Sequence, residues 1–490
     1  MATDGPQKRG SLFRELRGLL ADRGITVRVE PFHTPLDKAG GYCQLFGHRL
    51  VLLDARASEA EQVRALLESI EAIGLETLGL NGKDLSPELL RTLNGRGHMP
   101  WPHKTQAPTL ARAMERIDHQ RPLAPFTTLG TGGPALRFAR VSARLSLVSA
   151  LLALREENLP ILILGGGSNL VVSDRGVRAS VVAMNTRGLE WQKDGESVLV
   201  TAQAGEPWDA FVAETVKRGL TGLECLSGIP GHVGATPIQN VGAYGQEVSE
   251  AIEWLNVLDT TTGEELQVSK LESEFGYRDS LWKRAPRGRY VVLDVTFRLF
   301  SSRPPTLRYE DLKRRLSGSS QPSLAQVREA VLELRRSKSM VIDASDENTR
   351  SCGSFFVNPI VSGEDLARVA RASQKEPPHF VDGTDRFKVP AAWLIEQAGL
   401  TRGTRLGPVG LSTQHTLALV AHSGATSSDV VRLAHAVRQR VEDKFGVRLR
   451  PEPDFWGFNE LEDGLPSLAE LDAPASGLPG VEPVAPDQAL

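Results

Sequence analysis

The spacing of apolar and polar residues predicts a small α/β unit at the start of the chain. Residues 11–23 place leucines and a phenylalanine on one helical face, and the apolar stretches ITVRVEPF and HRLVLLDA have the character of strands. Ser58 and Glu61 have the spacing of a capping box, which marks the start of a second helix. We therefore expect residues 1–95 to form a small α/β module.

Two stretches of low apolar content lie on either side of the large region that follows the N-terminal module. The first, NGRGHMPWPHKTQAPT, is rich in Gly, Pro and polar residues, a composition typical of loops. Residues 96–120 are therefore predicted to be a linker. The second stretch follows Asp463, is rich in Pro and Ala, and contains no Lys or Arg. Because it has little apolar surface to bury, residues 464–490 are predicted to be a disordered tail.

Between the linker and the tail, helical and strand-like patterns alternate. Apolar runs typical of strands occur in PILILGGGSNLVV, SVLVTAQAG, AIEWLNVLD and RYVVLDVTFRLF. Helical periodicity occurs in SLVSALLALREEN, EPWDAFVAETVKRG, PSLAQVREAVLELRRSK and ATSSDVVRLAHAVRQRVEDKFG. The alternation predicts a fold of mixed α/β type.

Composition and charge exclude several classes of protein. The chain has 490 residues, 40% of them hydrophobic and 24% charged, with a formal net charge of −3. This charge argues against a protein built to coat nucleic acid or an anionic membrane. No apolar run approaches the roughly 20 residues that a membrane-spanning helix needs, and the first residues lack the apolar core of a secretion signal. The three cysteines are far apart, which fits neither a disulfide framework nor a metal site and predicts a cytoplasmic protein.

The first glycine-rich motif follows an apolar strand at residues 165–169. Its three glycines allow positive φ angles and a close approach of the backbone to a ligand. Successive N–H groups in such a turn can bind phosphate oxygens. The motif lacks the GxGxxG spacing of a dinucleotide-binding Rossmann unit, and no helix clearly follows it. A plain loop and a phosphate site both remain open.

A second glycine-rich stretch covers residues 228–245. Small residues dominate it, and Gln239 and Asn240 offer amide donors and acceptors suited to the edge of a pyrimidine-like ring. Two glycine loops in one α/β region fit a long ligand with a central pyrophosphate better than a single phosphate. The alternative is a pair of tight turns.

Five motifs in order carry a family resemblance: LILGGGSNLVVSD, LSGIPGHVGATPIQNVGAYG, FGYRDSLWK, SCGSFFVNP and PEPDFWG. Together they resemble the UDP-N-acetylenolpyruvoylglucosamine reductase (MurB) family over roughly residues 121–460. The YRDSLWK block and Tyr309 in LRYEDL resemble the longer form of that enzyme. Residues 1–95 lie outside the resemblance.

The resemblance implies an FAD-binding fold of the vanillyl-alcohol-oxidase type, with two subdomains over residues 121–318. It also implies a C-terminal α+β substrate domain over residues 319–445. Residues 446–463 would then carry a catalytic glutamate back to the site.

The resemblance also implies a reaction in peptidoglycan precursor synthesis, with consequences for cell shape and cell division. NADPH would give a hydride to FAD, and UDP-N-acetylglucosamine enolpyruvate would then take it, forming UDP-N-acetylmuramate. The family's FAD contacts carry over to Gly165, Gly166, Gly167, Ser168, Asn169, Leu170, Gly228, Ile229, Pro230, Gly234, Ala235, Ile238, Gln239, Asn240, Gly242, Ala243 and Tyr244.

The chemistry of this reaction calls for a cation and an acid near the substrate carboxylate. Hydride addition to the β-carbon of an enolpyruvyl ether drives negative charge into the carboxylate, which needs fixed stabilisation. Arg278 can bind a carboxylate bidentately, and the resemblance implies this role; a lone Arg is otherwise commonly a surface ion pair. Glu452 would help only if it is protonated or shared with a cation. Without the resemblance it reads as an exposed acid at a strand end.

The carbon next to the carboxylate must then receive a proton, and the resemblance implies that Ser354 donates it. An alkyl hydroxyl is a poor acid and needs electrostatic help, while Cys352 is expected to be a packing residue. Two positions depart from the family pattern: Val357 stands where some relatives carry Lys, and Asp454 where some carry Arg. The substrate contacts that carry over are Tyr309, Arg335, Lys338, Asn358 and Gln414.

Two other functions remain open from the sequence. One is an FAD oxidase or dehydrogenase of a small alcohol, which would not need Arg278, Ser354 and Glu452 together. The other is a non-catalytic regulator that acts through the N-terminal module. Within residues 1–95, His33, Cys43 and His48 are too scattered to predict a metal site, and none is predicted elsewhere. For this module we expect a docking or regulatory role toward a protein partner.

Overall fold

The computed structural model describes residues 6–30, 40–45, 48–73, 78, 117–144, 147, 150–151, 154 and 159–472. Most of the predicted linker and the end of the predicted tail lie outside these residues. Within the described residues, no helix is both long and apolar enough to cross a membrane.

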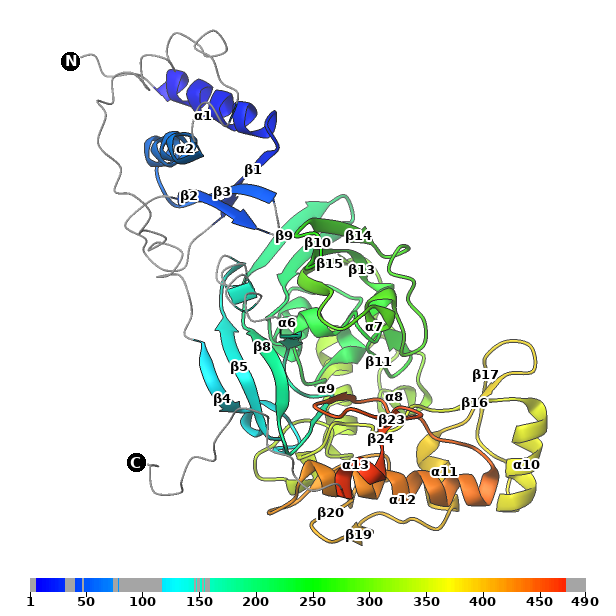
Figure 1. The fold of residues 1–490 in the computed structure, drawn as a ribbon. Helices are drawn as coiled ribbons and strands as arrows, with labels where there is room; N and C mark the ends of the chain where they lie inside the picture. Colours follow the sequence, from blue (N-terminus) through cyan, green and yellow to red (C-terminus); the bar gives the residue numbers. More distant parts are fainter. Residues whose placement is uncertain are drawn as a thin grey trace.

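The N-terminal module packs two helices on one small sheet (Figure 1). Its sheet has the order β1-β3-β2, with β1 parallel and β2 antiparallel to β3. The predicted capping box is confirmed, because the Ser58 amide donates to the Glu61 carboxylate at 2.8 Å. Leu16, Val51 and Leu66 are fully buried in its core. Its elements are α1 (Pro6–Ala21), β1 (Ile25–Glu30), β2 (Gly40–Leu45), β3 (His48–Asp54) and α2 (Glu59–Ile73).

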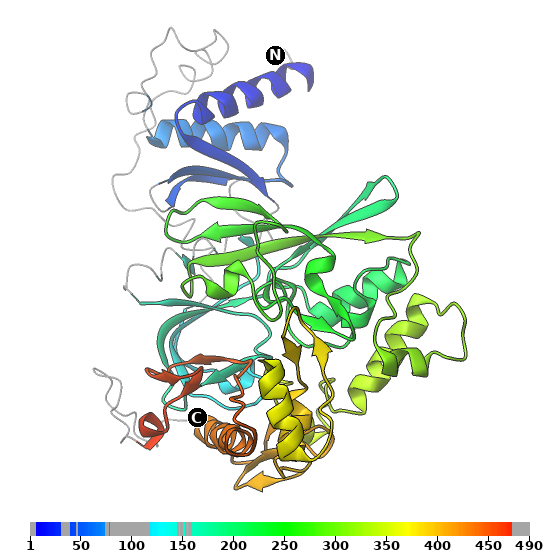
Figure 2. The same cartoon turned by 90° about the vertical axis from the view of Figure 1, so that its right-hand side faces the viewer.

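A five-stranded antiparallel sheet of order β14-β13-β15-β10-β9 forms the middle of the chain (Figure 2). The helix α6 packs on it, with the Phe211 ring 5.1 Å from that of Phe297. The predicted strands and helix are confirmed here. The bounds are β9 (Leu189–Asp194), β10 (Ser197–Gln203), α6 (Trp208–Lys217), β13 (Ile252–Asp259), β14 (Glu265–Ser269) and β15 (Tyr290–Phe300).

A second sheet of order β4-β5-β8-β6 lies beside the first. The strands β5, β8 and β6 run parallel, and β4 is antiparallel to β5. After β6 the chain passes through the first glycine loop into β7, so no helix follows that loop, as predicted. The bounds are β4 (Asp118–Pro122), β5 (Pro134–Val141), β6 (Ile161–Leu164), β7 (Leu170–Val172) and β8 (Val177–Met184).

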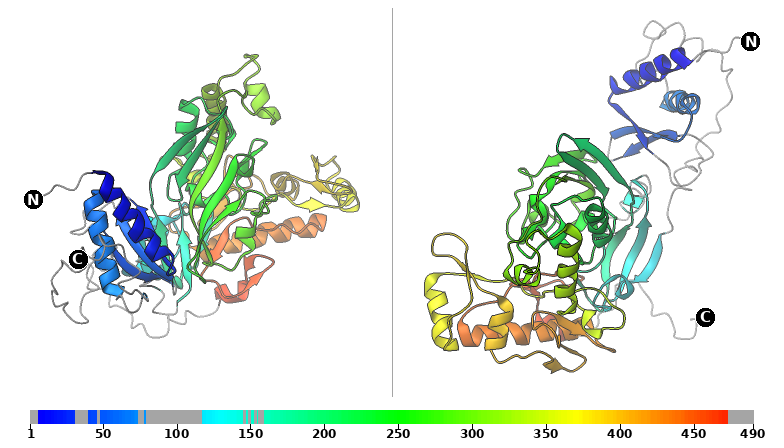
Figure 3. Two further views of the ribbon diagram at one scale, coloured as in Figure 1. Left: turned by 90° about the horizontal axis from the view of Figure 1, so that it is seen from above. Right: turned by 180° about the vertical axis from the view of Figure 1, so that it is seen from behind.

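The C-terminal region packs α12 against small sheets, on the side of the molecule away from the N-terminal module (Figure 3). Thr426 and Asp429 form a capping box at the start of α12, and Ser323 and Gln326 form another at α9. The helices from here on are α8 (Glu310–Arg315), α9 (Leu324–Arg336), α10 (Gly363–Ser373), α11 (Ala391–Gln397) and α12 (Ser427–Phe445), and α7 (Leu281–Arg284) belongs to the middle region before β15.

Short strands complete the region around these helices. One of them returns to an earlier part of the chain: β22 pairs in parallel with β7, more than 280 residues before it. The short strands are β11 (Gly242–Ala243), β12 (Gln246–Glu247), β16 (Ile360–Val361), β17 (Phe380–Val381), β18 (Phe387–Lys388), β19 (Arg405–Leu406), β20 (Val409–Leu411), β21 (Leu419–Ala421) and β22 (Asp454–Trp456).

Ordered elements extend beyond the residue at which the disordered tail was predicted to begin. The strands β23 (Leu461–Glu462) and β24 (Leu465–Pro466) form a hairpin, and α13 (Leu468–Asp472) follows it. This part of the tail prediction is corrected, because Leu465 is fully buried in the C-terminal core. The bias toward Pro and Ala did not reveal that one apolar side chain anchors the segment.

Candidate active site

A cavity of about 650 Å³ opens where the two glycine loops, the chain before β15 and the C-terminal segment meet. This volume lies in the range of small-molecule sites, roughly 300–1,000 Å³. The first loop contributes residues 165–170 to the cavity wall, and the second contributes residues 229–232 and 234–236. Arg278, Ser354 and Glu452 also line it. The structure thus brings together all three predicted catalytic residues.

The two glycine loops touch each other, and their contact requires glycine. A Cβ on Gly166 would lie 2.7 Å from the Cα of Gly231. Gly167 has a φ of +62°, and a Cβ there would lie 1.8 Å from the backbone oxygen of Phe126, which packs on the first loop from outside the second. The hydroxyl of Ser168 donates to the Pro230 carbonyl at 3.1 Å, which ties one loop to the other. The glycines therefore serve a close packing of backbone on backbone.

The first loop fits the predicted pyrophosphate. Within the described part of the chain, the amides of residues 165–168 donate to no protein group. Unused N–H groups of consecutive residues suit anionic oxygens. No side chain longer than that of Ser168 projects from these four positions. The residues present therefore fit a ligand whose phosphates approach the backbone.

Arg278 reaches the cavity from a tight turn. Gly276 and Asp279 exchange backbone hydrogen bonds around it, and Arg278 itself has a φ of +53°. Its Nη2 donates to the Gly242 carbonyl at 3.0 Å. Its Nε lies 3.0 Å from Oε1 of Glu452, as an ion pair rather than an aligned hydrogen bond. The guanidinium is thus held in place from two sides.

Glu452 is held in a network that joins the glycine loops to the C-terminal segment. Gln239 Nε2 donates to the Glu452 carboxylate at 3.3 Å. Asn169 Nδ2 donates to the Gln239 side-chain oxygen at 3.0 Å and to the Glu452 carbonyl at 3.2 Å. The side chain of Glu452 is 11% exposed. Of the two conditions stated for this acid, the structure satisfies the second: the carboxylate is shared with a cation.

Ser354 and Glu452 come together through pairing of their flanking residues. Phe356 and Pro451 form an antiparallel bridge, and the Glu452 amide donates to the Phe355 carbonyl at 2.8 Å. Both phenylalanines are buried, with their rings 5.2 Å apart. Ser354 therefore lines the cavity next in the chain to two residues of a well-packed apolar core.

Cys352 is a buried packing residue, as predicted. Its Sγ lies 3.6 Å from the Leu170 carbonyl, and the side chain belongs to the C-terminal core. Burial raises the pKa of the Cys352 thiol well above its usual range. A thiolate nucleophile is therefore disfavoured at this position.

A second cluster of titratable groups lies beside the cavity, around the β11–β12 hairpin. The rings of Tyr244 and Tyr309 meet edge to face at 5.4 Å, and Lys338 Nζ lies 6.0 Å above the Tyr244 ring. Burial raises the pKa of Tyr244 to about 12 and lowers the pKa of Lys338. Arg335 lines the cavity and donates to the Met340 carbonyl at 2.7 Å.

Several predicted residues do not form the cavity wall. Asn240 is 1% exposed, and protein groups occupy its amide: it donates to Glu247 at 2.8 Å and to the Gly276 carbonyl at 3.0 Å. Asn358 accepts from the Ala391 amide at 2.9 Å at the start of α11. The other predicted residues outside the wall are Gly228, Tyr244, Tyr309, Lys338 and Gln414.

Arg287 is a wall residue that the sequence reasoning missed. It pairs with Asp454 and donates from Nη1 to the Phe455 carbonyl at 2.9 Å. Trp456 Nε1 donates to the same Asp454 carboxylate at 2.9 Å. Asp454 was noted as a departure from the family pattern, but its partner lies 167 residues earlier and has no local signal.

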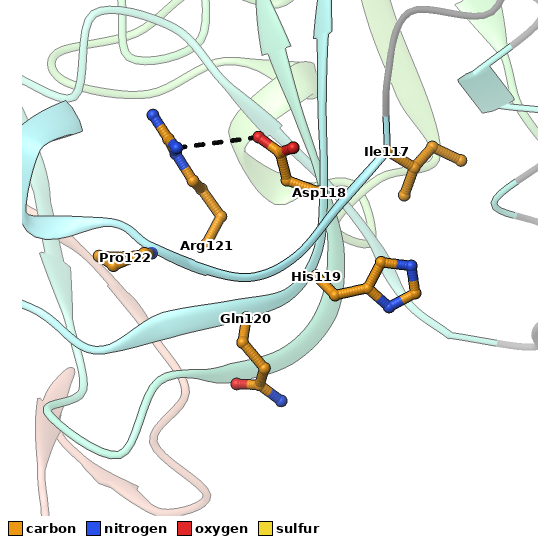
Figure 4. Close-up of a pocket in the computed structure, with 6 residues that line it drawn as sticks. All are labelled: Ile117, Asp118, His119, Gln120, Arg121 and Pro122. Atoms are coloured by element: carbon orange, nitrogen blue, oxygen red, sulfur yellow. Dashed lines mark ion pairs between the residues drawn. The ribbon is translucent and has the colours of Figure 1, made fainter. Parts of the chain in front are cut away.

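A separate hollow of about 400 Å³ lies along β4 (Figure 4). Six consecutive residues, 117–122, line it, and Asp118 and Arg121 form an ion pair at 3.9 Å. The side chains of His119 and Gln120 point away from that pair. Among the described residues, no group of three or more His, Cys, Asp or Glu could hold a metal ion. We therefore assign the chemistry to the larger cavity.

Comparison with known proteins first identifies the class. A family model for an FAD binding domain matches residues 135–269, which include both glycine loops. The chain is therefore an FAD-binding protein of mixed α/β fold, as predicted. A second model, UDP-N-acetylenolpyruvoylglucosamine reductase, C-terminal domain, matches residues 345–456, which include Ser354 and Glu452.

Curated relatives then identify the family. UDP-N-acetylenolpyruvoylglucosamine reductase of Thermobifida fusca is 47% identical over 342 residues, covering 68% of this chain and 96% of the relative. The Streptomyces coelicolor enzyme is 44% identical, covering 70% and 91%. The crystal structure of the reductase from Thermus caldophilus is 26% identical, with a TM-score of 0.48, covering 70% and 99%. The chain belongs to the UDP-N-acetylenolpyruvoylglucosamine reductase family.

Proposed function

We propose that this chain reduces UDP-N-acetylglucosamine enolpyruvate to UDP-N-acetylmuramate with FAD, using NADPH as the reductant, in the cytoplasm. The observation that carries the proposal is the convergence of Arg278, Glu452 and Ser354 on a cavity that the two glycine loops also line. A flavin oxidase of a small alcohol would have no use for the cation, acid and hydroxyl together.

The glycine loops orient the flavin in this proposal. Residues 165–168 offer amides to its pyrophosphate, and Gln239, Gly242 and Ala243 lie farther along the same wall. When bound there, FAD supplies the hydride chemistry that the side chains of the chain lack. NADPH and the enolpyruvyl substrate use the same cavity in turn.

Arg278 and Glu452 act on the substrate carboxylate. Negative charge that develops there meets the Arg278 guanidinium, whose turn and Gly242 contact keep it in place. Donors fixed before the reaction stabilise charge without further reorganisation. Glu452 keeps the guanidinium oriented, since the two groups lie 3.0 Å apart.

Ser354 gives a proton to the carbon next to the carboxylate. The residue lines the cavity and is followed by the buried Phe355 and Phe356, which fix its backbone in the core. Arg278, which lines the same cavity, supplies the electrostatic help that a serine hydroxyl needs to act as an acid. Proton and hydride together convert the enolpyruvyl group to a lactyl ether with atoms and charge in balance.

The nucleotide side of the substrate lies toward the second cluster in this proposal. Arg335 and Lys338 supply positive charge, and Tyr309 supplies a ring beside them. Asn358 and Gln414 complete the proposed substrate contacts. Gly228, Asn240 and Tyr244 support the cofactor loops from behind, since they lie outside the cavity wall.

The test is a spectrum followed by an assay. Purified protein is expected to be yellow, with FAD released on denaturation, and to consume NADPH at a rate that depends on the enolpyruvyl substrate. Colourless protein that takes up no FAD would exclude every flavin enzyme. Yellow protein whose NADPH consumption ignores the substrate would exclude the reductase and favour another flavin activity.

For residues 1–95 we propose a docking or regulatory module. It has a core of its own, which includes Leu16, Val51 and Leu66, and Arg28 pairs with Glu265 on the edge strand β14. Neither family model reaches it, since the first begins at residue 135. A chain lacking residues 1–110 should keep its turnover rate. It should lose either the binding of a protein partner or the regulation of its activity. Unchanged activity, assembly and cellular partners would remove this proposal.

A further inference from the structure

A buried glutamate lies behind the second cluster and takes no part in the chemistry above. Glu224, in the turn η2 (Glu224–Leu226), has no exposed surface. Its carboxylate accepts from the Gly222 amide at 2.7 Å, from the Thr221 hydroxyl at 3.2 Å and from the Thr306 amide at 2.7 Å. A buried carboxylate with three donors is well satisfied. One of these donors belongs to a different part of the chain.

Thr306 is held at each of its polar groups. Its amide meets Glu224, and its carbonyl lies 3.1 Å from the Cys225 thiol, which donates to it. Its hydroxyl accepts from Gln246 Nε2 at 3.2 Å. Gln246 in turn accepts from the Cys225 amide at 3.0 Å. Glu224 and its neighbour therefore fix one point of the connection between β15 and α8.

Three residues after this fixed point comes Tyr309, whose ring meets that of Tyr244. The residues around them are open to solvent: residues 301–304, Arg308 and Glu310 are exposed. Arg308 donates to the Gly245 carbonyl at 3.0 Å, which adds a contact at the rim. In a connection whose flanking residues are exposed, the bonds at Thr306, together with the packing of Leu307 and Tyr309 on the core that contains Leu312, set where Tyr309 stands.

We propose that Glu224 is a positioning residue: by holding Thr306, it places Tyr309 over the nucleotide side of the substrate site. This inference deepens the proposed function and rests on it. Glu224 touches neither the cofactor cavity nor Ser354. It therefore acts on substrate affinity and leaves hydride and proton transfer unchanged.

Glu224→Gln is the direct test, since Gln keeps the shape but offers one acceptor oxygen and a donor NH₂ group. Loss of a buried charge-assisted hydrogen bond changes the equilibrium that depends on it about tenfold. In the FAD-loaded full chain, hydrogen exchange of a peptide covering residues 304–309 should speed up about tenfold. KM for the enolpyruvyl substrate should rise about tenfold, with kcat and FAD content within about twofold of the parent.

Glu310→Gln is the matched control, because Glu310 is exposed and pairs with Lys313 in the following turn. It should change neither exchange nor KM. Unchanged exchange and KM in Glu224→Gln would overturn the proposal. So would a loss of kcat with KM constant, because Glu224 would then act on the chemistry.

Thr221→Val provides a second variant if Glu224→Gln does not fold. It keeps Glu224 and removes one donor, which also bonds the Pro304 carbonyl at 3.4 Å. A smaller rise in exchange and in KM is expected for this variant. No change in either quantity would overturn the proposal. A parent protein that reduces no enolpyruvyl substrate would defeat the proposed function alone, while the exchange comparison would still test the anchoring of Thr306.

Discussion

Two walls of the cavity are built in different ways. The wall of residues 165–168, 231, 234 and 235 offers mainly backbone, because these positions carry only Gly, Ser or Ala and the two loops touch. The wall of Arg278, Ser354 and Glu452 offers functional groups held by contacts between distant segments. The first wall is suited to bind the cofactor, and the second is suited to carry out the reaction. Substitutions in the two walls should therefore change FAD affinity and reaction rate separately.

The largest effect is expected at the reactive wall. Ser354→Ala should leave FAD binding and flavin reduction by NADPH intact, and slow flavin reoxidation by the substrate about 10³-fold, the usual scale of a lost general acid. Stopped-flow absorbance of each half-reaction measures both rates. Cys352→Ala is the control, because its buried thiol should not matter to either rate. Equal losses in both half-reactions would contradict Ser354 as the proton donor.

The next effect belongs to the glycine wall. Gly166→Ala places a Cβ 2.7 Å from the Cα of Gly231 and should weaken FAD binding about 10- to 100-fold, since overpacking costs about 1–3 kcal/mol. Gly165→Ala is the matched control, because its Cβ would meet that of Ala235 at an ordinary 3.5 Å. Flavin content and titration calorimetry report the difference. Similar affinities for the two variants would show that contact between the loops does not govern binding.

A separate effect concerns the pH dependence of folding stability, through His415 near Lys338. Burial, with Lys338 nearby, lowers the pKa of His415 to about 4. The unfolded chain binds a proton near pH 6.5 and the folded chain does not, so stability should fall as pH drops from about 6.5 to about 4. The contribution should be about 3 kcal/mol, since each pKa unit corresponds to about 1.4 kcal/mol. Denaturant titrations should show a flatter pH dependence for His415→Asn. If stability falls with pH at the same slope in the variant and the parent, His415 is not the cause of that fall.

The smallest effect is expected at Asp454. Its ion pair with Arg287 is about half exposed on both sides, and such pairs are worth about 0–1 kcal/mol. Asp454→Asn should therefore change flavin reoxidation by less than about fivefold. Stopped-flow rates at low and high salt measure this change. A loss close to that of Ser354→Ala would mean that the pair positions Glu452 and belongs to the reactive wall.

Local features were predictable where a residue's own backbone or its near neighbours decide them. The capping box at Ser58, the helix at α12 and the strand before the first glycine loop follow from spacing alone. The tail was less predictable, because the burial of Leu465 depends on a core built by distant helices. Asn240 has the chemistry of a ligand contact, but protein groups occupy its amide.

The sequence by itself determined several of the helices and strands, the two glycine loops and the family to which the chain belongs, but not strands such as β5 and β8. These properties depend on short-range periodicity and on motifs that can be read one at a time. Only the tertiary structure decided that Glu452 meets Arg278 and Gln239, that Asp454 has a partner, and that Glu224 holds Thr306. Each contact joins segments separated by 80 to more than 200 residues. Long-range packing sets such distances, and no local pattern encodes them.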